Sequence, residues 1–300
     1  MSTDSAATLD VQNLFNVKGL VAVVTGGGTG IGLMIAKALA LNGASKVYII
    51  GRRLEKLQEA AKASPHGNII PLEGDITSQD SLSALAEKVK SQTGYIDLLV
   101  PNAGIMGPKL RDLSPTCSID DFVSHAWKTP MSDFTNTYDV NVTGVYYTIL
   151  AFLALLQKGN ERNGGKGWRE GGGVSSQIVT VGSIAAFSRK EGASFAYNSS
   201  KAGLTHLCKH LSTYFGRWRV RVNVVAPGMY PSEMSTPLSG VKDGTQEGAI
   251  DPKIIPETRT GKEEDMAGVI LFLAGKAGAY NNGSIITTDG GRIGVLPSSY

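Results

Sequence analysis

The sequence has little of what disulfide-rich, metal-binding, nucleic-acid-binding or membrane proteins need. Its 300 residues include only two cysteines, Cys117 and Cys208, whose spacing fits neither a disulfide framework nor a zinc site, so we expect free thiols in a reducing compartment. The net charge is only +3 and the basic residues form no run, which disfavours nucleic-acid binding. The longest apolar run, residues 145–156, is too short to span a bilayer.

Two further absences bear on location and metal binding. The amino-terminal stretch MSTDSAATLDVQN has neither the apolar segment of a signal peptide nor the arginines of a transit peptide, so we expect a cytoplasmic protein with no membrane partner. His206 and His210 are spaced like a helical metal-binding pair, but no acidic residue accompanies them, and surface histidines are the more common explanation. We therefore predict no metal site.

Short apolar runs alternate with amphipathic stretches along the chain, and 42% of the residues are hydrophobic. Strands are predicted at 19–26, 46–50, 68–74, 95–100, 176–182, 220–226 and 283–291. Between them the spacing predicts helices, including a long one over 132–157 and a late one over 263–274. This alternation predicts an α/β fold with a doubly wound parallel sheet of about seven strands and helices on both faces.

The chain shows no long linker, so we expect a polar lead at residues 1–17 and one domain at 18–300. Three segments lack periodicity. Residues 105–130 and a substrate loop at 229–258 follow strands, and open α/β sheets bind ligands at the carboxyl ends of their strands. The glycine-rich stretch 159–173 precedes a strand and is expected to be a flexible surface insertion at the opposite edge.

Tyr197 and Lys201 stand one helical turn apart in AYNSSKAG, on a stretch whose apolar residues recur at helical intervals. A cation about 5 Å from a phenol, at an effective dielectric constant of about 20, favours the phenolate by roughly 3 kcal/mol, or about two pKa units. Such a tyrosine could transfer protons near neutral pH. Ordinary exposed helix pairs have the same spacing, so the motif alone leaves both interpretations open.

A glycine-rich turn, TGGGTGIG (25–32), follows the first predicted strand and opens a helix. Glycines at this position let the backbone approach a pyrophosphate, and the helix start offers free N–H groups. The second strand ends in Arg52 and Arg53, where an acid would accept a ribose 2′-hydroxyl. Because guanidinium groups suit phosphate, the sequence favours NADP(H) over NAD(H), unless both arginines are merely solvated residues at a helix start.

Taken together, five motifs in this order resemble the short-chain dehydrogenase/reductase family over residues 18 to 292. They are TGGGTGIG, GDI (74–76), NAG (102–104), NVTG with VGS, and YNSSK. The resemblance implies a Rossmann-like fold and a catalytic set of Asn141, Ser183, Tyr197 and Lys201. In the family the tyrosine donates a proton to the carbonyl oxygen as hydride arrives, the lysine lowers its pKa and holds the nicotinamide ribose, the serine binds the substrate oxygen, and the asparagine holds a water.

The resemblance also implies a set of cofactor-binding residues beyond Tyr197 and Lys201. They are Gly26, Thr29, Gly30, Ile31, Gly32, Arg52, Arg53, Asp75, Ile76, Asn102, Ala103, Gly104, Pro227, Gly228, Tyr230 and Ser232. Two positions depart from the family pattern. Pro101 replaces a common asparagine, and Tyr230 stands where an isoleucine or valine usually packs on the nicotinamide, so it could reshape the pocket wall.

The expected substrate is a medium-sized apolar or aromatic ketone, because the segments near the site carry an apolar set with no carboxylate or phosphate clamp. That set is Met106, Trp127, Phe187, Tyr230 and Met234. We predict an NADPH-dependent carbonyl reductase. The alternatives are an alcohol or polyol dehydrogenase working oxidatively, and an NADP(H)-binding protein with an isomerase, cyclase or regulatory role. The polar lead and the YPSEM stretch resemble filamentous-fungal members, many of which serve specialised metabolism, and the family implies a homodimer or homotetramer.

Overall fold

The computed structural model describes residues 9–109, 113–114, 116–165, 174–190, 194–234 and 243–300. Seven parallel strands form one sheet in the order β3-β2-β1-β4-β5-β6-β7, which confirms the predicted fold class. The strands are β1 Val21–Thr25, β2 Lys46–Gly51, β3 Ile69–Glu73, β4 Leu98–Val100, β5 Gln177–Val181, β6 Arg221–Pro227 and β7 Ile285–Thr288.

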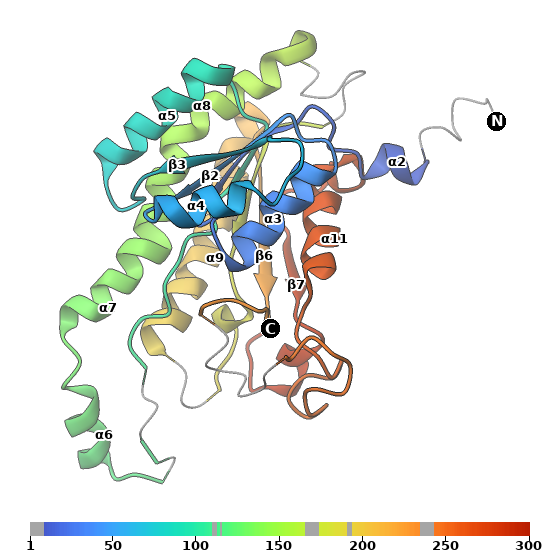
Figure 1. The fold of residues 1–300 in the computed structure, drawn as a ribbon. Helices are drawn as coiled ribbons and strands as arrows, with labels where there is room; N and C mark the ends of the chain where they lie inside the picture. Colours follow the sequence, from blue (N-terminus) through green and yellow to red (C-terminus); the bar gives the residue numbers. More distant parts are fainter. Residues whose placement is uncertain (1–8, 110–112, 115, 166–173, 191–193, 235–242) are drawn as a thin grey trace.

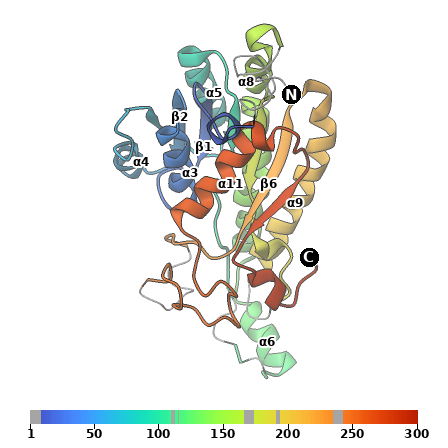
Figure 2. The same cartoon turned by 90° about the vertical axis from the view of Figure 1, so that its right-hand side faces the viewer.

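Helices cover both faces of the sheet (Figures 1 and 2), and Figure 2 shows β6 between α11 and α9. On one face lie α3 Gly30–Leu41, α4 Leu54–Ala61 and α11 Glu263–Ala274. On the other lie α5 Gln79–Thr93, α8 Gly144–Gly165 and α9 Phe195–Phe215. Shorter elements are α2 Val11–Leu14, α6 Ile119–Ala126, α7 Met131–Tyr138, the π turn η1 Asp139–Thr143, and the 3-10 turns η2 Ile184–Ala186, η3 Gly216–Trp218, η4 Lys276–Gly278 and η5 Arg292–Val295.

The sheet is buried on both faces because its side chains alternate between two apolar clusters. Along β1, Ala22 and Val24 pack with the α3 and α11 side, while Val21 and Val23 pack with α5, α8 and α9. Every residue of β1, β4, β5 and β6 is buried, as expected of central parallel strands. The strand order reverses between β1 and β4, and the crevice beyond this switch point is where doubly wound sheets bind ligands.

The long helix predicted at 132–157 is corrected in two ways. A π turn over Asp139–Thr143 separates α7 from α8, and α8 continues to Gly165, so residues 159–165 are helical rather than part of a loop. Residues 166–173 lie outside the described residues. The stretch Met131–Arg162 contains a segment long and apolar enough to cross a membrane, but Ile149 and Phe152 pack it against the sheet like an ordinary core helix.

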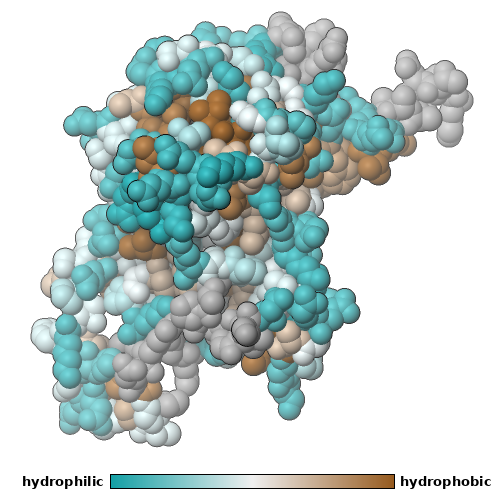
Figure 3. Space-filling model, in the orientation of Figure 1, coloured by the Kyte–Doolittle hydropathy of each residue, from teal (hydrophilic) through white to brown (hydrophobic). Residues whose placement is uncertain are grey.

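The aperiodic segment predicted at 105–130 contains a helix, α6, that begins with a capping box between Ser118 and Asp121. None of its residues is buried, and it extends away from the sheet (Figures 1 and 2). In the predicted substrate loop, residues 229–234 and 243–258 contain no helix or strand, and 235–242 lie outside the described residues. The face seen in Figure 3 is largely hydrophilic, with hydrophobic atoms in separate patches.

Candidate active site

The glycine turn between β1 and α3 is held in shape by the chain that follows β4. The Asn102 side-chain amide donates to the carbonyls of Thr25 (2.9 Å) and Gly26 (3.3 Å), and the Asn102 and Ala103 N–H groups donate to Thr25 Oγ1 at 3.0 and 3.1 Å. Gly26 has a φ of +66°, and a Cβ on Gly32 would overlap the Gly26 carbonyl. Only glycine fits these two positions, and the turn thereby leaves backbone exposed to a ligand.

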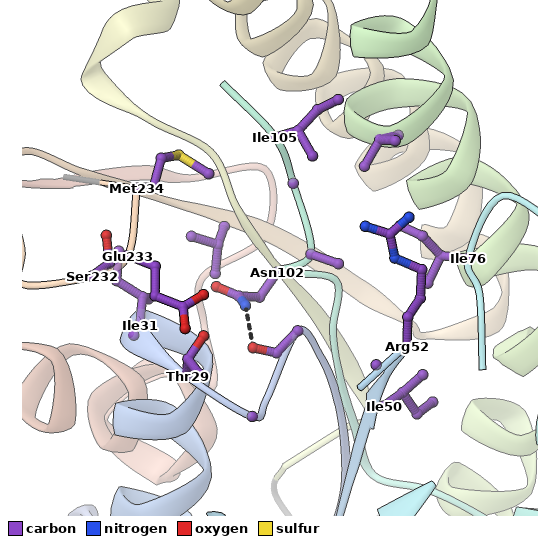
Figure 4. Close-up of a pocket in the computed structure, with 18 of the residues that line it drawn as sticks. Thr29, Ile31, Ile50, Arg52, Ile76, Asn102, Ile105, Ser232, Glu233 and Met234 are labelled. Carbon is purple, nitrogen blue, oxygen red and sulfur yellow. Dashed lines mark hydrogen bonds between the residues drawn. The ribbon is translucent and has the colours of Figure 1, made fainter. Parts of the chain in front are cut away.

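A cavity of about 420 Å³ lies over this turn (Figure 4), within the range of small-molecule and cofactor sites. It collects most of the residues predicted to bind a dinucleotide, from six separate parts of the chain. The predicted residues that line it are Gly26, Thr29, Gly30, Ile31, Arg52, Arg53, Asp75, Ile76, Asn102, Ala103, Gly104, Tyr197, Lys201, Ser232 and Met234. The α3 amino terminus faces this cavity without a side-chain cap on Thr29, so its N–H groups suit a pyrophosphate.

The catalytic tyrosine and lysine predicted from sequence both line the cavity from α9. Lys201 is 4% exposed, its ammonium donates to the Val181 carbonyl at 3.0 Å, and it lies 5.9 Å from the Tyr197 ring centre. Burial lowers the pKa of Lys201 to about 8. An ammonium beside the phenol can stabilise a phenolate that forms during proton transfer.

Ser183 ends up beside Tyr197, at the start of η2. Its Oγ accepts the Ala185 N–H at 3.1 Å and shares a hydrogen bond with the Tyr197 hydroxyl. Burial raises the pKa of Tyr197, and the bond with Ser183 lowers it. Burial thus favours the neutral phenol, and the ammonium of Lys201 donates to the Val181 carbonyl, so the lowering of the Tyr197 pKa by Lys201 stays a prediction. A neutral phenol is the form that can donate a proton.

Asn141 supports the site from the π turn rather than lining the cavity. Its amide donates to the Ile105 carbonyl at 2.9 Å and to Ser200 Oγ at 3.0 Å, and its oxygen accepts the Ile105 N–H at 2.9 Å. These bonds hold the chain after β4 next to Lys201, across the backbone of Gly104, where a Cβ would lie 3.1 Å from Asn141 Oδ1 and 3.6 Å from Lys201 Nζ. The water-holding role of Asn141 stays a prediction.

The end of β2 brings positive charge to the cavity. Arg52 and Arg53 line it together with Lys56, which lies one helical turn further along α4. Arg53 forms an ion pair with Glu233 at 2.8 Å. Asp75 accepts two hydrogen bonds from Thr77, which together with nearby Arg52 keep its pKa below the usual range.

Two residues that sequence analysis did not select, Lys56 and Glu233, line this cavity. Lys56 could have been predicted from the sequence, because residues three positions apart at the start of a helix lie on the same face, and Lys56 is three positions after Arg53. Glu233 belongs to a loop without periodicity, and no local pattern brings it to β2.

Several predicted residues lie outside the cavity-lining set, and Tyr230 is the clearest case. It is 3% exposed, and its hydroxyl forms a hydrogen bond with Thr288 Oγ1 at 2.6 Å. Its ring lies directly against Gly261, where any side chain larger than that of glycine would overlap it. The Tyr230 side chain is thus packed in the core rather than forming a pocket wall, and the contact of this residue with cofactor or substrate stays a prediction.

The other residues outside the lining have structural roles or no contact with the cavity. Gly32 shapes the turn, and the Gly228 N–H after Pro227 continues the pairing with β7 through the Thr288 carbonyl. Phe187 packs edge-on against Tyr300, and Trp127 is 87% exposed. Met106 does not line the cavity, although its neighbour Ile105 does. Among the described residues, no group of three or more His, Cys, Asp or Glu side chains could hold a metal ion.

The fold and site together define a dinucleotide-binding α/β protein with a Tyr, Lys and Ser constellation at its cavity. Residues 20–242 match the family model described as short chain dehydrogenase, and the chain belongs to the short-chain dehydrogenase/reductase family. It is 45% identical to short-chain dehydrogenase/reductase PhomF of Diaporthe leptostromiformis over the whole of both chains. It is 42% identical to short-chain dehydrogenase/reductase VdtF of Byssochlamys spectabilis, over 97% of this chain and 98% of that one.

Among solved structures, the Pseudomonas aeruginosa RhlG/NADP active-site complex superposes with a TM-score of 0.77 and 30% identity. The match covers 94% of this chain and 99% of that one. These relatives make the chain an oxidoreductase of this family, whose members use NAD(H) or NADP(H).

Proposed function

We propose that this protein is an NADPH-dependent oxidoreductase that reduces the carbonyl of a medium-sized apolar or aromatic ketone to a secondary alcohol. The observation that carries the proposal is one cavity that is lined by Tyr197 and Lys201, with Ser183 hydrogen-bonded to Tyr197, and that also presents Arg52 and Arg53. The first three groups fit carbonyl reduction, and the two guanidinium groups fit a 2′-phosphate.

The cofactor preference follows from the charges at the end of β2. Three cations, Arg52, Arg53 and Lys56, line the cavity where an acid would accept a free ribose hydroxyl. A planar guanidinium binds phosphate in a bidentate manner, and such charged hydrogen bonds contribute about 1.5–3 kcal/mol each. The structural relative RhlG was solved as an NADP active-site complex, which agrees with this preference.

The reaction assigns a separate task to each side chain. The bound dinucleotide would supply the hydride. Tyr197, neutral because burial raises its pKa, donates its proton to the carbonyl oxygen, while Ser183 donates a hydrogen bond to the same oxygen. Lys201, still charged near neutral pH, stabilises the phenolate that remains until the proton is replaced from solvent.

The substrate class follows from the apolar side chains that line the cavity. Ile105, Val140 and Met234 contribute apolar surface to it, and Arg52, Arg53 and Lys56 lie at or just after the end of β2. An apolar ketone would gain about 25 cal/mol for each Å² of apolar surface that it buries against these side chains. Activity confined to small phosphorylated or acidic substrates would contradict this assignment.

We also propose a homodimer or homotetramer built on α8 and α9. These helices leave Tyr147, Leu150, Phe195 and Tyr214 between 37% and 63% exposed, more apolar surface than a helix facing water needs. Sedimentation analysis should give a species of two or four chains, and Leu150→Glu should shift it toward the monomer. A monomeric wild type would contradict the assembly.

The test of the function combines cofactor titration with turnover. NADPH should bind at least tenfold more tightly than NADH, and NADPH should be oxidised in the presence of one or more ketones of an aliphatic and aromatic panel. Tyr197→Phe should lower kcat by at least a hundredfold while leaving the NADPH Kd within twofold, and Tyr280→Phe, a fully exposed tyrosine outside the cavity, is the matched control. Retained turnover in Tyr197→Phe would refute the assigned proton donor.

A further inference from the structure

Residues 229–234, here called the strap, run from the core to the cavity and are tied down at both ends. At the core end, Tyr230 bonds Thr288 and the Met229 carbonyl accepts the Gly261 N–H at 2.9 Å. At the other end, Ser232, Glu233 and Met234 line the cavity, and Figure 4 shows Ser232 and Glu233 beside Thr29 and Ile31. The strap therefore reaches the glycine turn, where Ser232 would contact any side chain on Gly30.

Glu233 connects this strap to the end of β2, 180 residues earlier in the chain, through Arg53. The two groups face each other with contacts of 2.8 and 3.5 Å between both guanidinium nitrogens and both carboxylate oxygens. Their side chains are 60% and 55% exposed, so the pair lies at the open side of the cavity rather than in the core. This fork geometry is the one that a phosphate would make with the same arginine.

Of the two acidic residues that line the cavity, Glu233 is the one paired with Arg53. The other acid of the cavity lining, Asp75, has its Oδ1 engaged by the Thr77 N–H and hydroxyl. Lys56 lies near enough to Glu233 to help keep its pKa below the usual range, after the larger effect of Arg53. The carboxylate is therefore ionised at neutral pH and imitates an anionic ligand.

We propose that Glu233 is an internal competitor for the 2′-phosphate, so that it sets how strongly the protein discriminates between phosphorylated and unphosphorylated dinucleotides. If the cavity binds NADP(H), as proposed above, Arg53 breaks its ion pair with Glu233 and binds the 2′-phosphate instead. The ion pair between the strap and the end of β2 is then lost. NAD(H), which lacks that phosphate, leaves the ion pair in place. Glu233 thus weakens the binding of NADPH but not of NADH.

The size of the effect follows from the strength of an exposed ion pair. Such pairs favour the paired state by a factor of about 1.5 to 5. If a ligand can bind only when the ion pair is open, its Kd rises by a factor of one plus the equilibrium constant for forming the pair. The Kd of such a ligand is therefore about two- to sixfold higher. Glu233→Gln should therefore lower the Kd of NADPH about two- to sixfold and change the Kd of NADH less than twofold.

Fluorescence titration of the full chain with NADPH and with NADH tests this directly. Glu247→Gln, an exposed glutamate on the same long loop outside the cavity, is the matched control and should change neither Kd. In an Arg53→Gln background, Glu233→Gln should have no effect on NADPH, since no pair is left to break.

The outcomes separate this inference from the proposed function. A wild type that binds NADH as tightly as NADPH would contradict the proposed cofactor preference. If the wild type prefers NADPH but Glu233→Gln has the same Kd as the wild type for both NADPH and NADH, the proposed competition by Glu233 is overturned while the cofactor preference stands. Equal tightening for NADPH and NADH would also overturn it, because it would indicate general repulsion of the dinucleotide rather than an exchange at Arg53.

Discussion

Replacing Lys201 by methionine should stabilise the protein while abolishing its activity. Lys201 is 4% exposed, and among the described residues its ammonium has one hydrogen bond, to the Val181 carbonyl. Burial lowers its pKa from 10.5 to about 8, so the charged ammonium destabilises the folded state relative to the unfolded state. The difference of about 2.5 pKa units corresponds to about 3 kcal/mol at neutral pH, and losing the hydrogen bond offsets about 1 kcal/mol of it.

The pH dependence gives the sharper test, because the lost hydrogen bond contributes equally at every pH. The folded pKa lies below the unfolded one, so the cost to the wild type is complete below pH 8, declines above it and is gone beyond pH 10.5. The stability advantage of Lys201→Met should therefore be about 2 kcal/mol larger at pH 6 than at about pH 9.5.

Urea unfolding at the two pH values, without added dinucleotide, measures this difference. Lys209→Met is the matched control, since Lys209 is exposed on the same helix, and it should show no such gain. An advantage that does not change with pH, or a Lys201→Met variant less stable than the wild type at pH 6, would refute the assigned cost of the buried charge.

Three other predictions concern the turn, the buried acid at the far end of the sheet and the strap. Gly32→Ala should cost about 1–3 kcal/mol and abolish dinucleotide binding, because the new Cβ overlaps backbone that cannot rotate away; Gly203→Ala, with open space around it, should not destabilise. Burial raises the pKa of Asp97 to about 7, so the stability of Asp97→Asn relative to wild type should grow as the pH rises from about 4 to 7; a flat difference would contradict it. Tyr230→Phe should cost about 1 kcal/mol in urea unfolding with an unchanged KM for NADPH, whereas a raised KM would return Tyr230 to the pocket.

The sheet and the turn were predictable because local chemistry determines them. Central strands such as Val21–Thr25 are continuous apolar runs, and the glycines that follow have no other common use at a strand-to-helix turn. The extent of α8 was not predictable in the same way. Gly159 and Asn160 look like loop residues, but a Cβ at Gly159 would overlap the Ile96 carbonyl, and Asn160 bonds the Ser176 N–H at 2.6 Å. Tertiary packing there overrides the local preference for a loop.

Inside the site, sequence spacing identified which residues meet but not how they are oriented. Tyr197 and Lys201 do share a face of α9, yet the ammonium turns to the Val181 carbonyl, which belongs to a strand far away in sequence. Tyr230 turns into the core because Gly261 and Thr288 leave a place for its ring and hydroxyl. The ion-pair partner of Arg53 is Glu233, and neither the sequence around Arg53 nor that around Glu233 indicates that the two residues meet.

The most direct test of the central claim follows the hydride itself. NADPH carrying deuterium at the transferring position of its nicotinamide is incubated with the wild type and a ketone that supports turnover, and the product is analysed by mass spectrometry. The account predicts a secondary alcohol with deuterium on the carbinol carbon, formed by the wild type and lost in Tyr197→Phe. Bound NADPH without any labelled alcohol across the ketone panel, or equal labelling by Tyr197→Phe, would contradict it.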